Sequence, residues 1–151
     1  MHIVVAPDSF KGTASAPEAA AAIAMGVRQV LPEATVTTLP MADGGEGTAA
    51  VLAQAAAAGG QSVETITLPT TDAIGRLTQA SYALAGTTAF IDVASATGLP
   101  AVQDSLDPLH ADSYGTGVLI ADAETRGATS IVLGLGGTAS IDAGMGILTA
   151  L

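Results

Sequence analysis

Apolar and polar positions divide the chain into short apolar runs and longer, alanine-rich runs with helical spacing. Short apolar runs bounded by glycine, proline or polar residues are typical of buried strands, and longer runs with capping residues are typical of helices. Strands are predicted at residues 2–6, 35–39 and 130–133, and helices at 16–30, 48–58, 113–126 and from about 142 onward. Strands that alternate with helices through short connections favour a parallel α/β sheet.

The predicted helices have recognisable boundaries. Ser15 and Glu18 have the spacing of a capping box, in which each side chain binds the backbone N–H of the other residue. Pro32 ends this first helix, and Gly59 and Gly127 end the two that follow it.

The middle of the chain follows a different pattern. Three strand-like runs, at 62–68, 77–84 and 87–93, have no helix between them, which predicts an antiparallel meander. Residues 96–112 are rich in proline, aspartate and glycine and are predicted to form a loop that crosses between lobes.

The predicted fold class is therefore α/β, a parallel sheet with flanking helices of the Rossmann or flavodoxin-like kind, plus a smaller β-rich lobe or insertion. Residues 1–60 and 112–151 are assigned to the α/β lobe and 61–111 to the second lobe. The last residues, 146–151, form an apolar helical start without a glycine stop or a polar tail. This predicts that the chain is cut inside a domain, so that the α/β lobe is incomplete.

Composition narrows the functional classes. The chain has 151 residues, of which 49% are hydrophobic, enough for a real core. Its formal charge of −10 opposes binding to nucleic acid. No apolar run reaches the roughly 18 to 20 residues of a membrane span, so we expect no membrane partner and a cytoplasmic location. The absence of cysteine excludes disulfides. An oligomer is compatible with these properties.

Three glycine-rich, acid-containing loops lie where an apolar run gives way to a helical one. The first loop reads APDSFKG at residues 6–12 and places Asp8, Ser9 and Lys11 directly after a strand. At the carboxyl edge of a parallel sheet, Asp8 could accept a proton from a hydroxyl or hold Mg²⁺, and Lys11 could neutralise a phosphate oxygen. A simple turn with a solvated lysine explains the same residues.

The second loop reads MADGGEGT at residues 41–48. Two glycines separate Asp43 from Glu46, a spacing that allows both carboxylates to face one metal ion while the backbone N–H groups of residues 44–48 face an anion. The alternative is an ordinary helix N-terminus, in which Glu46 complements the helix dipole and Thr48 caps the helix.

The third loop reads GLGGTASID at residues 134–142 and resembles a phosphate nest, although it lacks the lysine of a Walker A loop. Asp142 could bind metal or act as a base. The glycines that follow Ser113 are unusual in a helix, and a close backbone approach by a ligand or by the other lobe would explain them. Arg76 could clamp a carboxylate, or it could be a solvated charge at the end of a strand.

Four stretches of the chain, taken together, are distinctive: APDSFKG at 6–12, PMADGGEGT at 40–48, SYGTG at 113–117 and GLGG at 134–137. Their sequences and their order resemble the bacterial glycerate kinase family, and they correspond to the N-terminal portion of its much longer chains. The resemblance implies an enzyme of two α/β lobes with the active site between them. It implies ATP- and Mg²⁺-dependent transfer of the γ-phosphoryl group to a hydroxyl of D-glycerate.

The candidate residues follow from the loops and the resemblance together. The catalytic candidates are Asp8, Lys11, Asp43 and Asp142; the substrate-binding candidates are Ser9, Arg76, Gly44, Gly45, Glu46 and Ser113; the ATP-binding candidates are Gly134, Gly136, Gly137 and Thr138; and the metal candidates are Asp43 and Glu46. Which aspartate is the base and which binds metal stays open. The central prediction is that the three loops meet around one ligand.

The chain departs from the family pattern at several positions. It has AIGR at 73–76 where PLGR is usual, LDP at 106–108 where RNP is usual, Val118 where glutamate is usual, and SIDAG at 140–144 where TNDGG is usual. These changes remove an arginine, a glutamate and an asparagine. They support an alternative, a truncated or diverged domain that binds an anion or a partner chain without catalysis.

Overall fold

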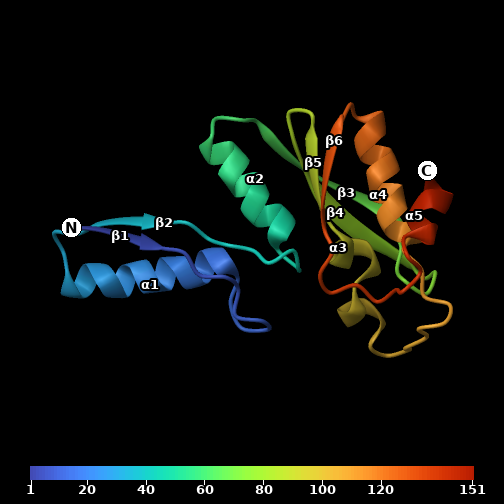
Figure 1. The fold of residues 1–151 in the computed structure, drawn as a ribbon, viewed down its shortest axis with the longest axis horizontal. Coiled ribbons are helices and arrows are strands. Elements are labelled where there is room, and N and C mark those ends of the chain that lie inside the picture. The colour runs from blue at the N-terminus through green and yellow to red at the C-terminus, as the bar shows by residue number, and fades with distance from the viewer. The chain divides into compact units, whose positions relative to one another are not determined.

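The chain divides at Asp43 into two units, Met1–Asp43 and Gly44–Leu151, in the computed structural model, which describes residues 1–151. Helices and strands alternate in Met1–Asp43, whereas three consecutive strands form the middle of Gly44–Leu151 (Figure 1). The protein has a mixed α/β fold with parallel strands and flanking helices, as the sequence predicts. None of its helices has the length and apolar composition needed to cross a lipid bilayer.

In Met1–Asp43, strand β1 (His2–Val5) pairs in parallel with β2 (Thr35–Thr38), and helix α1 (Ala16–Val30) connects them. The predicted capping box is present. The backbone N–H of Ser15 donates to Glu18 Oε2 at 2.8 Å, and Ser15 Oγ accepts from the Glu18 N–H. Helix α1 buries alanines on one face, and their small side chains permit close packing of the helix.

In Gly44–Leu151, four strands form one sheet in the order β3-β4-β5-β6. These are β3 (Val63–Thr71), β4 (Leu77–Ala85), β5 (Thr88–Asp92) and β6 (Ser130–Gly134). The first three form the predicted antiparallel meander, and β6 joins the same sheet by pairing in parallel with β5. The assignment of 1–60 and 112–151 to one lobe and 61–111 to another stays a prediction.

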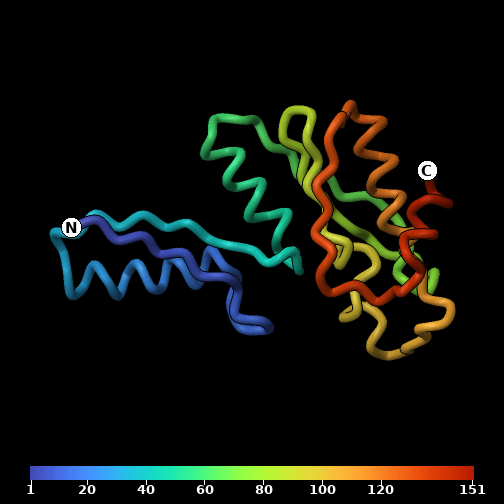
Figure 2. Tube along the Cα trace, viewed as in Figure 1, coloured from blue at the N-terminus to red at the C-terminus, as the bar shows by residue number.

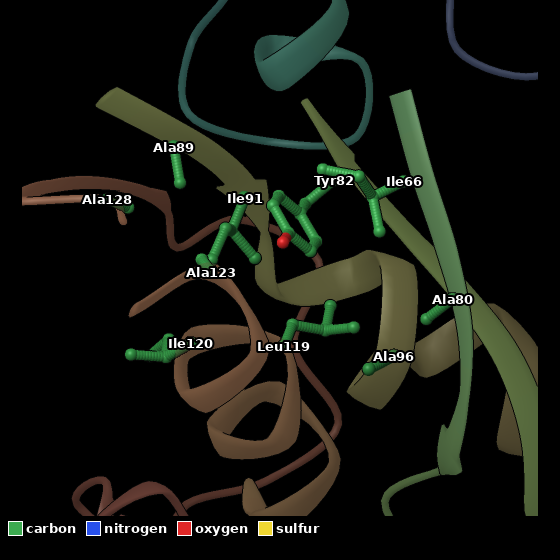
Figure 3. Close-up of a cluster of buried hydrophobic side chains, with 10 residues drawn as sticks. All are labelled: Ile66, Ala80, Tyr82, Ala89, Ile91, Ala96, Leu119, Ile120, Ala123 and Ala128. Atoms are coloured by element: carbon green, nitrogen blue, oxygen red, sulfur yellow. The ribbon is translucent and has the colours of Figure 1, made fainter. Parts of the chain in front are cut away.

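Helices cover both faces of this sheet. Helix α2 (Thr48–Ala58) lies on one side, and α4 (Tyr114–Thr125) with α5 (Met145–Ala150) lies on the other (Figure 1). Alternate residues of the strands point toward α4 and form the core drawn in Figure 3, where Tyr82 and Ile91 pack against Leu119. The buried Tyr82 hydroxyl donates to Asp122 Oδ2 at 2.8 Å, so the core leaves no buried side-chain polar atom without a partner.

Two short helices, α3 (Val93–Thr97) and η1 (Leu99–Val102), lie where the sequence predicts the end of a strand and a loop. Strands β4 and β5 pair only at their near ends. Beyond this point Ser95 of α3 takes the place of a strand partner, because its hydroxyl accepts from the Ser81 N–H at 2.9 Å and donates to the Ser81 carbonyl at 2.8 Å. A helix this short, fixed by a contact across the fold, has no periodic pattern for sequence analysis to detect.

Candidate functional site

The glycine-rich segments 44–48 and 134–137 lie side by side in Gly44–Leu151, as the trace in Figure 2 shows. The Gly136 N–H donates to the Gly44 carbonyl at 2.7 Å. A Cβ atom on Gly136 would lie 2.6 Å from Gly45 Cα, so only glycine allows this backbone contact. Strands β5 and β6 are parallel, and Asp92 at the end of β5 is in register with Gly134 at the end of β6. The third loop therefore leaves the sheet at the carboxyl edge of its parallel strands, where α/β folds bind ligands.

Glycine conformation shapes the part of the second loop that lies in this unit. Gly44 and Gly47 have φ values of +93° and +92°, which residues with a Cβ rarely adopt. Thr48 does not cap α2, because its hydroxyl donates to the Gly45 carbonyl at 2.7 Å. Glu46 is exposed on the loop. The N-cap residue of α2 is Gly47, which offers no side chain to the helix N-terminus.

Asp92 supplies the missing cap from another element. Its Oδ2 accepts from the Gly47 N–H and its Oδ1 from the Ala49 N–H, both at 2.8 Å. Its side chain is buried, and burial raises the pKa of Asp92, although these two backbone hydrogen bonds act to lower it. Asp92 is not among the candidate residues predicted from the sequence. The one available signal was an acid at the end of a strand, which is too common to single it out.

A pocket of about 420 Å³ lies beside the third loop. Polar groups of Thr138, Ser140, Ser113 and Asp142 line it together with apolar side chains that include Leu135 and Ile147. The loop is held in place by α3 and η1, because the Leu99 N–H donates to the Gly137 carbonyl at 2.8 Å and the Ala139 N–H to the Thr97 carbonyl at 3.0 Å. Thr138 and Gly137 are exposed at the pocket end of the loop.

Asp142 lies in this pocket wall with both carboxylate oxygens engaged. Its Oδ2 accepts from the Ser113 N–H, the Ser113 hydroxyl and the Gly146 N–H at 2.8 to 2.9 Å, and its Oδ1 accepts from the Gly144 N–H at 3.1 Å. Burial acts to raise the pKa of Asp142, but these bonds outweigh it and lower the pKa to about 2. So acidic a group is a weak proton acceptor, and the contacts favour an anchor between α4 and α5 over a base.

Ser113, Gly115 and Gly117 allow α4 to pack closely against its neighbours. The buried Ser113 hydroxyl accepts from the Ile147 N–H at 3.1 Å. A Cβ on Gly115 would collide with the Thr71 carbonyl, and one on Gly117 would lie 2.6 Å from the Ala150 Cβ. The predicted close backbone approach is therefore present, and β3 and α5 make it.

Arg76 has three partners within Gly44–Leu151. Its Nε donates to Asp72 Oδ2 at 2.6 Å, its Nη1 to Asp104 Oδ2 at 2.7 Å and its Nη2 to the Ala101 carbonyl at 2.6 Å. The Asp104 and Asp72 carboxylates raise the pKa of the Arg76 guanidinium. The guanidinium thus connects the β3–β4 turn to η1 and to the segment after it, and a ligand carboxylate would have to compete with these partners.

The remaining candidates lie in Met1–Asp43. Lys11 Nζ is 3.9 Å from Asp43 Oδ2, and the two side chains are 88% and 58% exposed. The Met41 N–H donates to the Pro7 carbonyl at 2.9 Å, so the first loop lies beside the start of the second. Asp8 is exposed and accepts from the Ser9 N–H at 2.6 Å. Within this unit the structure brings together the loop of Asp8 and the segment of Asp43.

No group of three or more histidine, aspartate or glutamate side chains converges as a metal site in the chain. Mg²⁺ needs no such cluster when a substrate phosphate supplies the other oxygen ligands, since one or two carboxylates are then enough. The assignment of Asp43 and Glu46 to one Mg²⁺ stays a prediction from their spacing.

The chain is similar to glycerate kinases over its whole length. The model of the glycerate kinase family matches residues 3–151. The chain is 44% identical to glycerate 2-kinase of Escherichia coli (strain K12) and 42% identical to glycerate kinase of Bacillus subtilis (strain 168), and in each case all of it aligns with 39% of the relative. A crystal structure of a proposed glycerate kinase 2 from Salmonella typhimurium LT2 superimposes with a TM-score of 0.83 at 42% identity, and the match covers 100% of this chain and 40% of that one. The chain thus spans about two fifths of the length of these relatives.

Proposed function

The chain belongs to the glycerate kinase family, and from this premise we propose that it is part of an ATP-dependent kinase that phosphorylates a hydroxyl of D-glycerate. One observation carries the proposal: segments 44–48 and 134–137 pack backbone against backbone at the carboxyl edge of the parallel strands β5 and β6. Such an arrangement brings two glycine-rich segments without large side chains to the edge of the sheet where α/β folds bind ligands, which suits a phosphorylated ligand.

The pocket beside the third loop supports a phosphate-bearing ligand. Its volume of about 420 Å³ lies within the usual range for small-molecule sites. The hydroxyls of Thr138 and Ser140, together with the Gly137 backbone, would hold the phosphates of ATP, whereas the Gly136 N–H is occupied by the Gly44 carbonyl. Glu46 would contribute a carboxylate to Mg²⁺, and the bound ion would neutralise phosphate charge that this acidic protein otherwise repels.

Residues of the first loop would supply the remaining chemistry. Asp8 is exposed and lies after β1, which suits a base that accepts the proton of the attacking hydroxyl or a ligand to the metal. Lys11 would neutralise a phosphate oxygen, and Ser9 would bind glycerate. Catalysis of this kind depends on positioning and charge neutralisation. The engaged carboxylate of Asp142 suits an anchor for the third loop.

An assay that measures ADP release in the presence and in the absence of D-glycerate tests this function. Thr138→Val removes the loop hydroxyl and keeps the shape of the side chain. It is expected to raise the KM for MgATP about tenfold, because one hydrogen bond to a charged group is lost. Thr125→Val is the matched control, because Thr125 donates to the Ala121 carbonyl on α4 away from the pocket. Absence of glycerate-dependent ADP release from the wild-type chain, together with absence of MgATP binding, would overturn the proposal.

The internal hydrogen bonds of two candidate site residues favour a second function. Arg76 and Asp142 are held by internal partners. Their engagement suits a module that binds a phosphate ligand without turning it over. Calorimetric titration with MgATP separates the two functions: binding without glycerate-dependent ADP release supports the module, and turnover supports the kinase.

A further inference from the structure

Asp92 caps a helix that begins in a distant part of the sequence. An N-cap side chain normally accepts from the N–H groups of the first helical turn, but the N-cap of α2 is Gly47. Asp92, 45 residues further along, accepts from the Gly47 N–H and, at 43 residues' separation, from the Ala49 N–H. The start of α2, and the loop that leads into it, are thereby fixed to the end of β5.

The third loop closes around the same carboxylate. A Cβ on Gly134 would lie 2.9 Å from Asp92 Oδ1 and 2.9 Å from the Gly44 carbonyl oxygen. Asp92 is only 8% exposed, so its carboxylate lies in a small space between the two glycine-rich segments. Its two hydrogen bonds therefore set both the shape of segment 44–48 and its position against Gly134.

No cation offsets this charge nearby. Helices α2 and α3 and strand β6, which pack around Asp92, carry no charged residue, and Glu46 is the charged group that acts on it. The ionised carboxylate is held by two backbone N–H donors alone. Such charge-assisted hydrogen bonds are stronger than those between neutral groups, so they suit a residue that must hold a glycine-rich loop in one conformation.

The geometry points to Asp92 as a positioning residue that holds segment 44–48 against the third loop and so sets the affinity for the phosphorylated ligand. This inference rests on the proposed function, because it assumes that these two segments bind that ligand. Asp92 itself touches backbone amides and not the ligand.

Asp92→Asn tests the positioning role directly. Asparagine has one acceptor oxygen where aspartate has two, so its NH₂ group must face either the Gly47 or the Ala49 N–H, and one of these amides loses its partner. Amide hydrogen exchange followed by NMR is expected to become about tenfold faster at whichever of Gly47 and Ala49 loses its partner. Asp122→Asn is the matched control, since Asp122 is a partly buried carboxylate that binds Tyr82 and Arg126 instead of the loop.

The two variants separate positioning from general stability. Faster exchange at Gly47 or Ala49 in Asp92→Asn alone supports the inference. Unchanged exchange in Asp92→Asn, or equally fast exchange in Asp122→Asn, overturns it. Exchange requires no catalysis, so this result stands apart from failure of the proposed function, which would appear as absence of MgATP binding by the wild-type chain.

Ligand affinity supplies the second readout. In calorimetric titration, Asp92→Asn is expected to weaken MgATP binding about tenfold and Asp122→Asn to leave it within about twofold, because tenfold corresponds to one lost charge-assisted bond. Equal MgATP affinity in Asp92→Asn and wild type would overturn the positioning role.

A third measurement leaves Asp92 in place, in case Asp92→Asn does not fold. In a Glu46→Gln background, which removes the titration of the neighbouring acid, the amide proton shifts of Gly47 and Ala49 are expected to move together through one acidic transition as Asp92 is protonated. Shifts at these two amides that do not change with pH would overturn the inference.

Discussion

An exposed ion pair of Met1–Asp43 and two carboxylates of Gly44–Leu151 differ in how firmly they are held. In Met1–Asp43, the Lys11 and Asp43 side chains are exposed and their charged atoms are 3.9 Å apart. In Gly44–Leu151, Asp92 and Asp142 are engaged by hydrogen bonds of 2.8 to 3.1 Å that come mostly from backbone N–H groups. The exposed pair can thus separate at little cost, whereas Asp92 and Asp142 fix the backbone.

This difference suggests a division of work between the units. Exposed ion pairs contribute little to stability, so their side chains can turn toward a ligand without weakening the fold. Carboxylates that accept from several backbone N–H groups fix the shape of loops. Removing such a carboxylate mainly lowers the free energy of unfolding. Substitutions in the two regions should therefore change different observables.

Gly136→Ala should have the largest effect. The new Cβ would lie 2.6 Å from Gly45 Cα, and because that atom belongs to the backbone the loops must separate. We expect a loss of about 3 kcal/mol in the free energy of unfolding, measured by urea denaturation, and loss of MgATP binding. Gly26→Ala is the control, because Gly26 lies in α1 with open space around it, and alanine there should stabilise the helix by up to about 1 kcal/mol. A Gly136→Ala protein as stable as wild type would contradict the backbone contact.

Asp142 should make the free energy of unfolding depend on pH in the acidic range. Its pKa in the folded state is about 2, below the ordinary 3.8, so the stabilisation is complete above pH 4 and is lost as the pH falls through about 2. The difference corresponds to about 2 kcal/mol. Unfolding curves of wild type and Asp142→Asn between pH 6 and about pH 2 should therefore converge at the acidic end. Glu124→Gln, which removes an exposed acid from α4, is the control and should leave the acid dependence intact.

Arg76→Ala should have a smaller effect on stability. It leaves the buried Asp72 without its cation and frees the segment at Ala101. Because the Arg76 side chain is 42% exposed, water replaces part of the lost interaction, and we expect a small decrease in the midpoint of urea denaturation. Arg28→Ala is the control, since Arg28 makes one long contact of 3.5 Å to the Val36 carbonyl. If the KM for glycerate rises while stability is unchanged, Arg76 binds substrate and its internal hydrogen bonds contribute little to stability.

Local signals predicted most of the elements. The capping box at Ser15, the glycine stops and the alternation of the meander each arise from neighbours in sequence, and each is present in the structure. The parallel pairing of β5 with β6 is not among these predictions, because the sequence pattern assigns residues 61–111 and 112–151 to different lobes.

Contacts between distant residues were not predictable in the same way. Asp92 binds amides more than 40 residues away, and Asp142 binds Ser113 at a separation of 29 residues. Nothing in the local sequence separates such a carboxylate from one that faces a ligand, so the sequence offers Asp142 as a metal ligand or base and does not single out Asp92. The meeting of segments 44–48 and 134–137 was predicted by the carboxyl-edge rule, and the prediction that the first loop shares their ligand stays a prediction.

Lys11→Ala should have the smallest effect on stability, and it makes the sharpest contrast between the units. Since the ion pair with Asp43 is exposed and 3.9 Å long, its loss should leave the melting temperature unchanged within error. If Lys11 neutralises phosphate charge, however, glycerate-dependent turnover should fall at least a hundredfold, because an electrostatic contact in a transition state of this kind is worth several kcal/mol. Lys11→Arg retains the charge and should recover part of that turnover. A fall in melting temperature with turnover unchanged would reverse the comparison, because the exposed pair would then be a structural contact.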